Sequence, residues 1–327
     1  EYLIRVTYTL RDDHSWASAG HAVAFDEHLT DWKALKPVVK TPKSSIEESD
    51  DVFLLREGDN EYRISRKDGS LLSVKRGGTE LLATPLTPNF WRAPTDNDRH
   101  GGKAGDDPKL PQWPWRSAFD KASVKTSVNS RDGSIIADMK LPGVDSTLRI
   151  RYYVPRSETI AVTLELSRGK TSPMLPRFGV TLGLPSAFED SAFYGRGRTE
   201  TQWDRKSGTP LERNEMPIAD LRFDYVRPQE SGTRTDTRWL ELTGDGVPGI
   251  RFSAAPHFDF SIWPYTMESL EKAAHPVDLK PAGFHTVNID LRQMGIGGDD
   301  SWTLKALPLP RYRLESLGRK LNFTLEF

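Results

Sequence analysis

The stretch TLRIRYYV at residues 147–154, together with TIAVTLEL at residues 159–166, decides the fold class of this chain. In both segments apolar residues alternate with polar ones, and β-branched and aromatic side chains are frequent. A period of two residues is typical of strands that have one face in a core and the other in water. The two segments therefore predict β-strands in a sheet with a buried face.

The same alternation recurs along the rest of the chain, at residues 3–10, 61–65, 239–243, 258–263, 285–291 and 321–327. Between the predicted strands lie pairs that favour tight turns, Asp68-Gly69, Asp132-Gly133 and Asp245-Gly246. The best helical pattern is short and covers residues 266–274, where Met267, Leu270 and Ala274 share one face. We therefore predict an all-β protein with two packed antiparallel sheets.

Composition excludes several classes of function. The 327 residues contain 45 Lys and Arg against 46 Asp and Glu, and no Cys. Without Cys there is no disulfide, thiolate nucleophile, Cys-ligated zinc or Cys-held iron–sulfur cluster. Balanced charge gives no global field that attracts nucleic acid or an anionic membrane. No run approaches the roughly 18 apolar residues of a membrane-spanning helix.

The composition changes near residues 31–50, where Lys and Pro give way to a run of acidic residues. This change predicts a linker at 31–50 between a short first part, residues 1–30, and one large sandwich, residues 51–327. Thirty residues are too few for an independent β-domain. Because they begin with a strand pattern, we expect the chain to start inside a domain.

The first dense cluster of polar residues follows Phe90 and contains Arg92, Asp96, Asn97 and Asp98. Two carboxylates and an amide within three residues could bind a hard cation or sugar hydroxyls. The glycine and glutamate of an EF-hand do not follow at the required spacing. Pairing of Arg92 with an aspartate, with the other side chains capping turns, explains the cluster without a ligand.

Two further clusters lie at residues 194–205 and 225–239. The first contains Gly-Arg-Gly without the third glycine of a dinucleotide fingerprint, so its glycines more simply permit a tight bend. The second interleaves arginines with acidic residues between aromatic ones. It could bind an oligosaccharide or an acidic ligand, or it could form a ladder of ion pairs between strands.

The fourth cluster, MGIGGDDSW at residues 294–302, combines a glycine-rich loop with Asp299, Asp300 and Trp302. Sugar sites use such groups, because a rigid ring contacts the apolar face of a pyranose while carboxylates accept from its hydroxyls. A tryptophan in this position could equally anchor the core.

In this order, the four clusters resemble the C-terminal region of β-galactosidases of glycoside hydrolase family 2. That family carries Phe-x-Arg-Ala-Pro-x-Asp-Asn-Asp, Gly-x-Gly-Pro-x-Glu-x-Tyr-x-Asp-Arg, Pro-Gln-Glu-x-Gly-x-Arg and Met-Gly-x-Gly-Gly-Asp-Asp-Ser-Trp. The resemblance covers about residue 50 to the end, and residues 2–28 resemble the last strands of the preceding immunoglobulin-like domain. The second motif departs from the family, with Arg198 in place of its Pro and Gln202 in place of its Tyr.

The resemblance implies a large antiparallel supersandwich, similar to galactose mutarotase, after the end of an immunoglobulin-like sandwich. In the family the catalytic glutamates lie on an upstream barrel, so no catalytic residue is expected in this chain. Trp302 corresponds to the residue that stacks on sugar in the leaving-group subsite. The other matching positions divide into an entrance loop and site lining, Arg99, His100, Gly101, Gly102, Asp299 and Asp300, and a structural set, Arg92, Asp96, Asn97, Asp98, Glu200, Asp204 and Arg205.

The resemblance further implies a β-galactoside or oligosaccharide ligand, a catalytic barrel portion in the same or a companion chain, and an oligomeric parent enzyme. No cofactor is expected here, since the parent family commonly uses Mg and Na at sites outside this region. The alternative is a stand-alone carbohydrate-binding or aldose-epimerase-like protein. Epimerisation would need an acid/base pair, commonly His and Glu, on the concave face of one sheet, and His257 and His285 are the candidate histidines.

Overall fold

In a computed structural model, the chain is described at residues 1–32, 42–99, 113–300, 303–315 and 318–327. It divides into two compact units, Glu1–Lys40 and Thr41–Phe327. The first unit contains an antiparallel pair, β1 (Leu3–Thr9) and β2 (Ala22–Leu29). Its apolar side chains are largely exposed, so this pair has no core of its own among the described residues.

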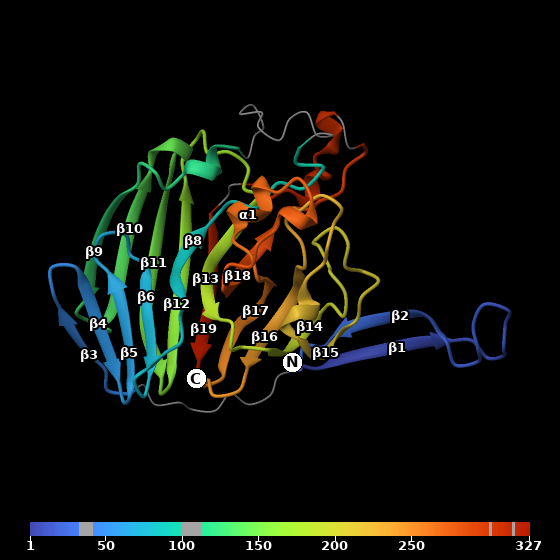
Figure 1. Ribbon diagram of the computed structural model, residues 1–327, viewed down its shortest axis with the longest axis horizontal. Helices are drawn as coiled ribbons and strands as arrows, with labels where there is room; N and C mark the ends of the chain where they lie inside the picture. Colours follow the sequence, from blue (N-terminus) through green and yellow to red (C-terminus); the bar gives the residue numbers. More distant parts are fainter. Residues whose placement is uncertain (33–41, 100–112, 301–302, 316–317) are drawn as a thin grey trace. The chain divides into compact units, whose positions relative to one another are not determined.

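The second unit begins with an antiparallel meander whose neighbouring strands follow one another in sequence (Figure 1). Its strands are β3 (Ser45–Glu48), β4 (Val52–Glu57), β5 (Asn60–Ser65), β6 (Leu71–Arg76), β7 (Thr79–Glu80) and β8 (Thr84–Asn89). A second meander follows, with β9 (Ser123–Asn129), β10 (Ser134–Leu141), β11 (Ser146–Arg156) and β12 (Thr159–Arg168). Buried side chains of both meanders belong to one hydrophobic cluster, so the two sheets pack face to face.

The boundary predicted at residue 50 requires a correction, because β3 lies inside the predicted linker 31–50 and pairs with β4. Ile46 packs half-buried against the core, and Glu47 forms an ion pair with Arg56. Acidic residues are depleted in strands, so the acidic composition of this segment did not indicate a strand. Residues 33–41 of the predicted linker lie outside the described part of the chain.

The remaining strands connect the two meanders. They are β13 (Arg177–Pro185), β14 (Asp190–Arg196), β15 (Leu211–Pro217), β16 (Arg234–Thr243), β17 (Ile250–Trp263), β18 (Phe284–Gln293) and β19 (Arg319–Glu326). Strand β13 pairs with β8 and β18, and the long β17 pairs with β16, β18 and β19. Strand β19 also pairs with β12, so the C-terminal strand joins the two parts of the sheet.

One short α-helix, α1 (Met267–Lys272), lies where the sequence predicts it, and the Thr266 side chain caps its N-terminus by accepting from the Ser269 amide. In the described part of the chain, six 3-10 helices cover Trp113–Ser117, Pro142–Val144, Ile218–Leu221, Pro276–Asp278, Leu304–Ala306 and Pro310–Tyr312. No helix of the described residues is long and apolar enough to cross a bilayer. The prediction of an all-β antiparallel sandwich is confirmed.

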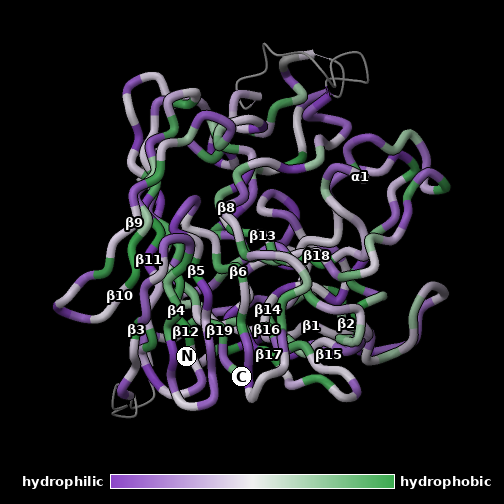
Figure 2. Tube along the Cα trace, turned by 60° about the vertical axis from the view of Figure 1, so that its left-hand side comes forward, coloured by the Kyte–Doolittle hydropathy of each residue, from purple (hydrophilic) through white to green (hydrophobic). Residues whose placement is uncertain are grey.

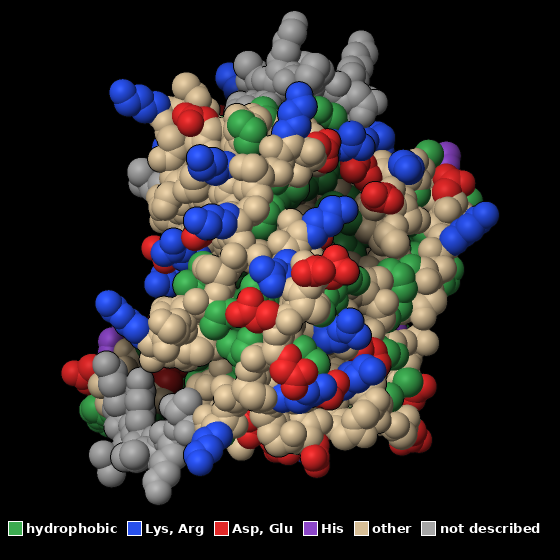
Figure 3. Space-filling model, turned by 90° about the vertical axis from the view of Figure 1, so that its left-hand side faces the viewer, with side chains coloured by type: hydrophobic (Ala, Val, Ile, Leu, Met, Phe, Trp, Pro, Cys, Tyr) green, Lys and Arg blue, Asp and Glu red, His purple; other side chains and the backbone are tan. Residues whose placement is uncertain are grey.

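The second meander shows how alternation builds the fold. Along β11, buried residues alternate with more exposed ones, and hydrophobic residues recur along β10 and β11 in the hydropathy view (Figure 2). Arg149 on the outer face donates two hydrogen bonds to the Asp138 carboxylate, at 2.7 and 3.0 Å. Acidic and basic side chains are mixed over the face drawn in Figure 3, with no large patch of one sign.

Candidate functional site

Arg92 connects the first and fourth motifs. It is fully buried after β8, and its Nε and Nη2 each lie 2.9 Å from one carboxylate oxygen of Asp98. Its guanidinium also donates to the carbonyl oxygens of Met294 (2.5 Å) and Gly295 (3.1 Å). A two-pronged arginine–carboxylate pair fixes geometry as well as charge. Arg92 therefore joins two segments about 200 residues apart in sequence.

The neighbours of this pair are also bonded. The Asp96 amide donates to Gln229 Oε1 (3.0 Å), while Gln229 Nε2 donates to the Asp96 carboxylate (3.1 Å). Arg99 is buried and donates to the Glu271 carbonyl (3.1 Å). Asn97 is half-buried. These contacts join the first motif to the third and to α1.

Asp204, from the second motif, binds the glycine-rich loop of the fourth. Its Oδ2 accepts from the amides of Ile296 (2.9 Å) and Gly297 (2.7 Å). A Cβ atom at Gly295 would lie 2.6 Å from the same oxygen, so the loop can only approach the carboxylate this closely without a side chain there. The glycine motif and Asp204 thus form one structural unit.

Glu200 has a buried carboxylate with three partners. It accepts from Arg205, from the Tyr225 hydroxyl (2.6 Å) and from the Gly232 amide (2.6 Å). Burial and the negative charge of Glu200 raise the pKa of Tyr225 to about 12. These bonds join the second motif to the third.

The predicted substrate-contacting residues are only partly described. Asp300 accepts from the amide (2.9 Å) and hydroxyl (2.7 Å) of Thr303, and the exposed Asp299 donates its amide to Lys305 O (2.8 Å). Both aspartates directly follow the loop bound by Asp204. Four predicted residues lie outside the described part of the chain, Trp302, His100, Gly101 and Gly102.

A network of charges lies in the core between β13 and β18. Arg177 is completely buried and donates to Glu230 (2.7 Å) and Asp290 (3.1 Å), while Gln293 also donates to Glu230 (3.0 Å). Burial raises the pKa of Asp290 to about 7, to which the negative charges of Glu230 and Asp259 add although Arg177 opposes the shift. Burial also raises the pKa of Glu230. The network is closed to solvent.

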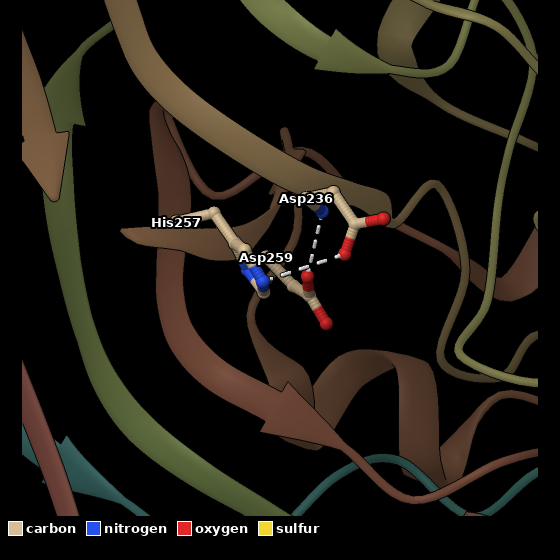
Figure 4. Close-up of side chains that lie close together, drawn as sticks. All are labelled: Asp236, His257 and Asp259. Carbon is tan, nitrogen blue, oxygen red and sulfur yellow. Dashed lines mark hydrogen bonds and ion pairs between the residues drawn. The ribbon is translucent and has the colours of Figure 1, made fainter. Parts of the chain in front are cut away.

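Asp236, His257 and Asp259 lie together on β16 and β17 (Figure 4). Their ligand atoms fall within 4.8 Å of one another, which is compatible with a metal ion. The Asp236 amide donates to Asp259 (3.0 Å), and His257 Nε2 lies 3.8 Å from Asp236 Oδ1. However, Lys206 Nζ already lies 2.7 Å from both carboxylate oxygens of Asp236.

The charges around Asp236 disfavour a metal ion. Besides Lys206, the guanidinium groups of Arg196 (3.1 Å) and Arg292 (3.3 Å) contact its carboxylate. Although burial opposes it, Lys206 and its cationic neighbours hold the pKa of Asp236 at about 2. Burial lowers the pKa of His257 to about 4, and Arg292 adds to this effect. A dication would have to displace cations that the protein itself provides.

The two histidines considered for epimerisation are not brought together. Trp263 of β17 lies opposite Thr286 of β18, so His285 falls beyond the end of β17, whereas His257 lies six residues before Trp263. His285 Nε2 instead contacts the Phe188 carbonyl oxygen at 2.9 Å.

A family model described as Beta galactosidase small chain matches residues 56–327, which contain all four motifs and the contacts between them. The chain belongs to this family.

The β-galactosidase of Priestia megaterium (strain DSM 319 / IMG 1521) is 31% identical over 314 residues, covering 94% of this chain and 30% of that protein. The β-galactosidase of Halalkalibacterium halodurans is 32% identical over 316 residues, covering 92% and 30%. Among solved structures, galactose 1-epimerase from Lactobacillus acidophilus NCFM aligns with a TM-score of 0.42 and 11% identity, covering 87% of this chain and 97% of that one. The chain therefore spans about three tenths of the length of these curated relatives.

The buried network of Arg177, Glu230 and Asp290 was not predicted from the sequence. Glu230 lies in the third motif, but Arg177 and Asp290 lie in strands without a motif. A signal was present for Arg177 alone, because it begins a largely apolar strand where a core residue is expected. Asp290 follows Ile289 at a polar position of an alternating strand, so the pattern did not indicate that it is buried.

Proposed function

We propose that this chain is a non-catalytic portion of a β-galactosidase that hydrolyses terminal β-D-galactosides with retention, and that it contributes the leaving-group subsite and an entrance loop. The observation that carries the proposal is the double attachment of residues 294–297, by Arg92 and by Asp204. A residue that stacks on sugar must be held in a fixed position. The attached segment leads directly to Asp299, Asp300 and Trp302.

The two carboxylates of a retaining mechanism would come from a companion catalytic portion. Such carboxyl groups lie about 5 to 5.5 Å apart in a pocket that the substrate enters. The carboxylates of Glu230 and Asp290 are instead completely buried and paired with Arg177. Relatives more than three times as long as this chain leave room for such a portion. We likewise assign any Mg or Na of the parent enzyme to sites outside this chain. The Asp236 carboxylate, which could otherwise bind such an ion, already contacts the side chains of two arginines and Lys206.

The β1–β2 pair supports a companion portion independently. Ile4, Val6 and Tyr8 on one face of β1 are each about half exposed. An isolated two-stranded hairpin is only marginally stable in water. We propose that further strands of the parent enzyme cover this face and complete an immunoglobulin-like sandwich.

An activity assay tests the proposal. The chain alone should not hydrolyse a chromogenic β-galactoside above background, because it would provide neither a general acid nor a nucleophile. The same chain within the full-length enzyme, or mixed with its catalytic portion, should be active. Turnover that stays with the isolated chain through repurification would contradict the proposal.

Trp302 provides the residue-level test. In the full-length enzyme, Trp302→Ala should weaken lactose or acceptor-sugar binding about fivefold, which corresponds to stacking of about 1 kcal/mol. Trp302→Phe retains a ring and should recover part of the loss. A large fall in Tm with unchanged KM for lactose would show that Trp302 is a core residue.

A further inference from the structure

A groove of about 590 Å³ opens beside the second motif. Thr199, Asp204 and Arg205 line one part of it, the turn containing Gly208 lines another, and Phe223 completes the wall. The groove thus brings together the second sequence cluster and Phe223, which lies just before the third. Asp204 is shared between this groove and the glycine-rich loop that it binds.

The charges that line the groove balance. Two carboxylates, Glu200 and Asp204, face two cations, Arg205 and Lys206, so the formal charge of the lining is 2 − 2 = 0. Glu200 is paired with Arg205, and Lys206 is bound to Asp236, the carboxylate drawn in Figure 4. A strongly charged ligand would find no excess of opposite charge here. The lining suits a neutral, polar molecule.

An aromatic ring is presented at the same place. Phe223 is 45% exposed, and its ring centroid lies 4.9 Å from that of Tyr225. Tyr225 is fixed in turn by its bond to Glu200 (2.6 Å). Phe223 is therefore a positioned apolar surface and not an isolated exposed side chain.

Hydrogen-bonding groups line the same groove as this ring. Thr199, Ser207 and Thr209 place hydroxyl-bearing side chains along the groove. The Arg205 side chain is 53% exposed, and its bonds to Glu200 and Tyr225 both leave from Nη2. An apolar ring beside polar donors and acceptors matches a pyranose, which has an apolar face and a rim of hydroxyls.

We propose that this groove binds a neutral saccharide, with one pyranose ring against Phe223 and its hydroxyls bonded by Arg205 and the neighbouring side chains. Binding requires no hydrolysis and no other part of the parent enzyme, so the proposal does not rest on the proposed function. A substitution at Gly208 can block the groove without straining the fold, since a Cβ atom there meets no atom within 4 Å.

The groove is tested by titrating the full chain with lactose and measuring Kd from the changes in its NMR spectrum. Wild type should bind saturably. Phe223→Ala should raise Kd about fivefold, whereas Leu309→Ala, which alters a side chain of the same 45% exposure outside the groove, should leave Kd unchanged. Gly208→Leu should abolish binding. Its control is Gly143→Leu, at another position where a Cβ atom meets no neighbour within 4 Å.

Several results would overturn the assignment. The first is absence of saturable lactose binding, and the second is binding that Phe223→Ala and Gly208→Leu leave unchanged. Loss of binding in Trp302→Ala but not in Phe223→Ala would place the sugar at the predicted leaving-group subsite and exclude the groove. Galacturonate binding more than tenfold tighter than lactose would contradict a neutral ligand. The hydrolysis assay on the full-length enzyme remains a separate test of the proposed function.

Discussion

The two parts of the sandwich differ in where their charged side chains lie. In the meander β9–β12, charged side chains lie on the outer face and pair there, as Arg149 does with Asp138. In the strands β13–β18, charges enter the core, and Arg177 is completely buried between Glu230 and Asp290. Burial of charge is costly and rarely improves stability over apolar packing. The four motifs also meet in the second part, so we infer that its irregular interior is retained for the site that it positions.

The largest difference is expected from removing a buried cation. Arg177→Met should destabilise the chain by about 3–5 kcal/mol, because Glu230 and Asp290 lose the guanidinium that compensates them. Arg149→Met in the regular meander should cost no more than about 1 kcal/mol, since both partners face water. Urea unfolding of the two variants measures the contrast. Equal effects would mean that the buried network is energetically no different from a surface pair.

A smaller contrast concerns glycines. Gly295→Ala should cost about 1–3 kcal/mol, because its methyl group would lie 2.6 Å from Asp204 Oδ2 and force the loop away. Gly143→Ala, between β10 and β11, meets no atom within 4 Å and should change stability by less than about 0.5 kcal/mol. Thermal unfolding compares them. An unchanged Tm for Gly295→Ala would show that the loop adapts freely to Asp204.

The two parts should also differ in pH dependence. Asp290 has a folded-state pKa raised to about 7, so the folded chain keeps a proton that the unfolded chain releases near pH 4. Stability should therefore rise by about 1 kcal/mol as pH falls from about 8.5 to about 6.5. In the regular meander, hydrogen bonds from Ser134 lower the pKa of Asp132, although burial opposes this, so its contribution is lost only in acid, below about pH 4.

Comparison with Asp290→Asn isolates this contribution from that of the histidines. The variant should have a flatter stability profile over the same pH range, measured as urea midpoints. A wild-type profile that rises with pH, or one that the substitution does not alter, would contradict a protonated Asp290 in the folded chain.

The smallest effect is expected on the outer face. Asp138→Asn removes one partner of Arg149, whose side chain is 56% exposed, and should cost about 0.2–1 kcal/mol at low salt. The cost should shrink as salt screens the pair. Unfolding at two salt concentrations measures it. A large loss of stability that salt does not change would show that the Arg149–Asp138 pair behaves like the buried network.

The same difference explains what the sequence could predict. Alternation located β11 and β12, and apolar residues on one helical face located the helix after Pro264, because each element has one face in the core and local turns or caps at its ends. Arg177 and Asp290 could not be paired from sequence, since their contact spans 113 positions and depends on the register of β13 with β18. The motifs named the candidate residues, and the role of those residues at a sugar site stays a prediction. Their mutual contacts, such as Arg92 to Met294, depend on the complete sheet.

Strand β19 has a consequence for closure of the sheet. Its residues, Arg319–Glu326, pair with β12 on one side and with β17 on the other. Until β19 docks between them, β12 and β17 each present an unpaired edge, and unpaired edges invite aggregation. A chain that lacks residues 319–326 therefore cannot close this sheet, so sheet closure has to wait for a strand far along the sequence from β12.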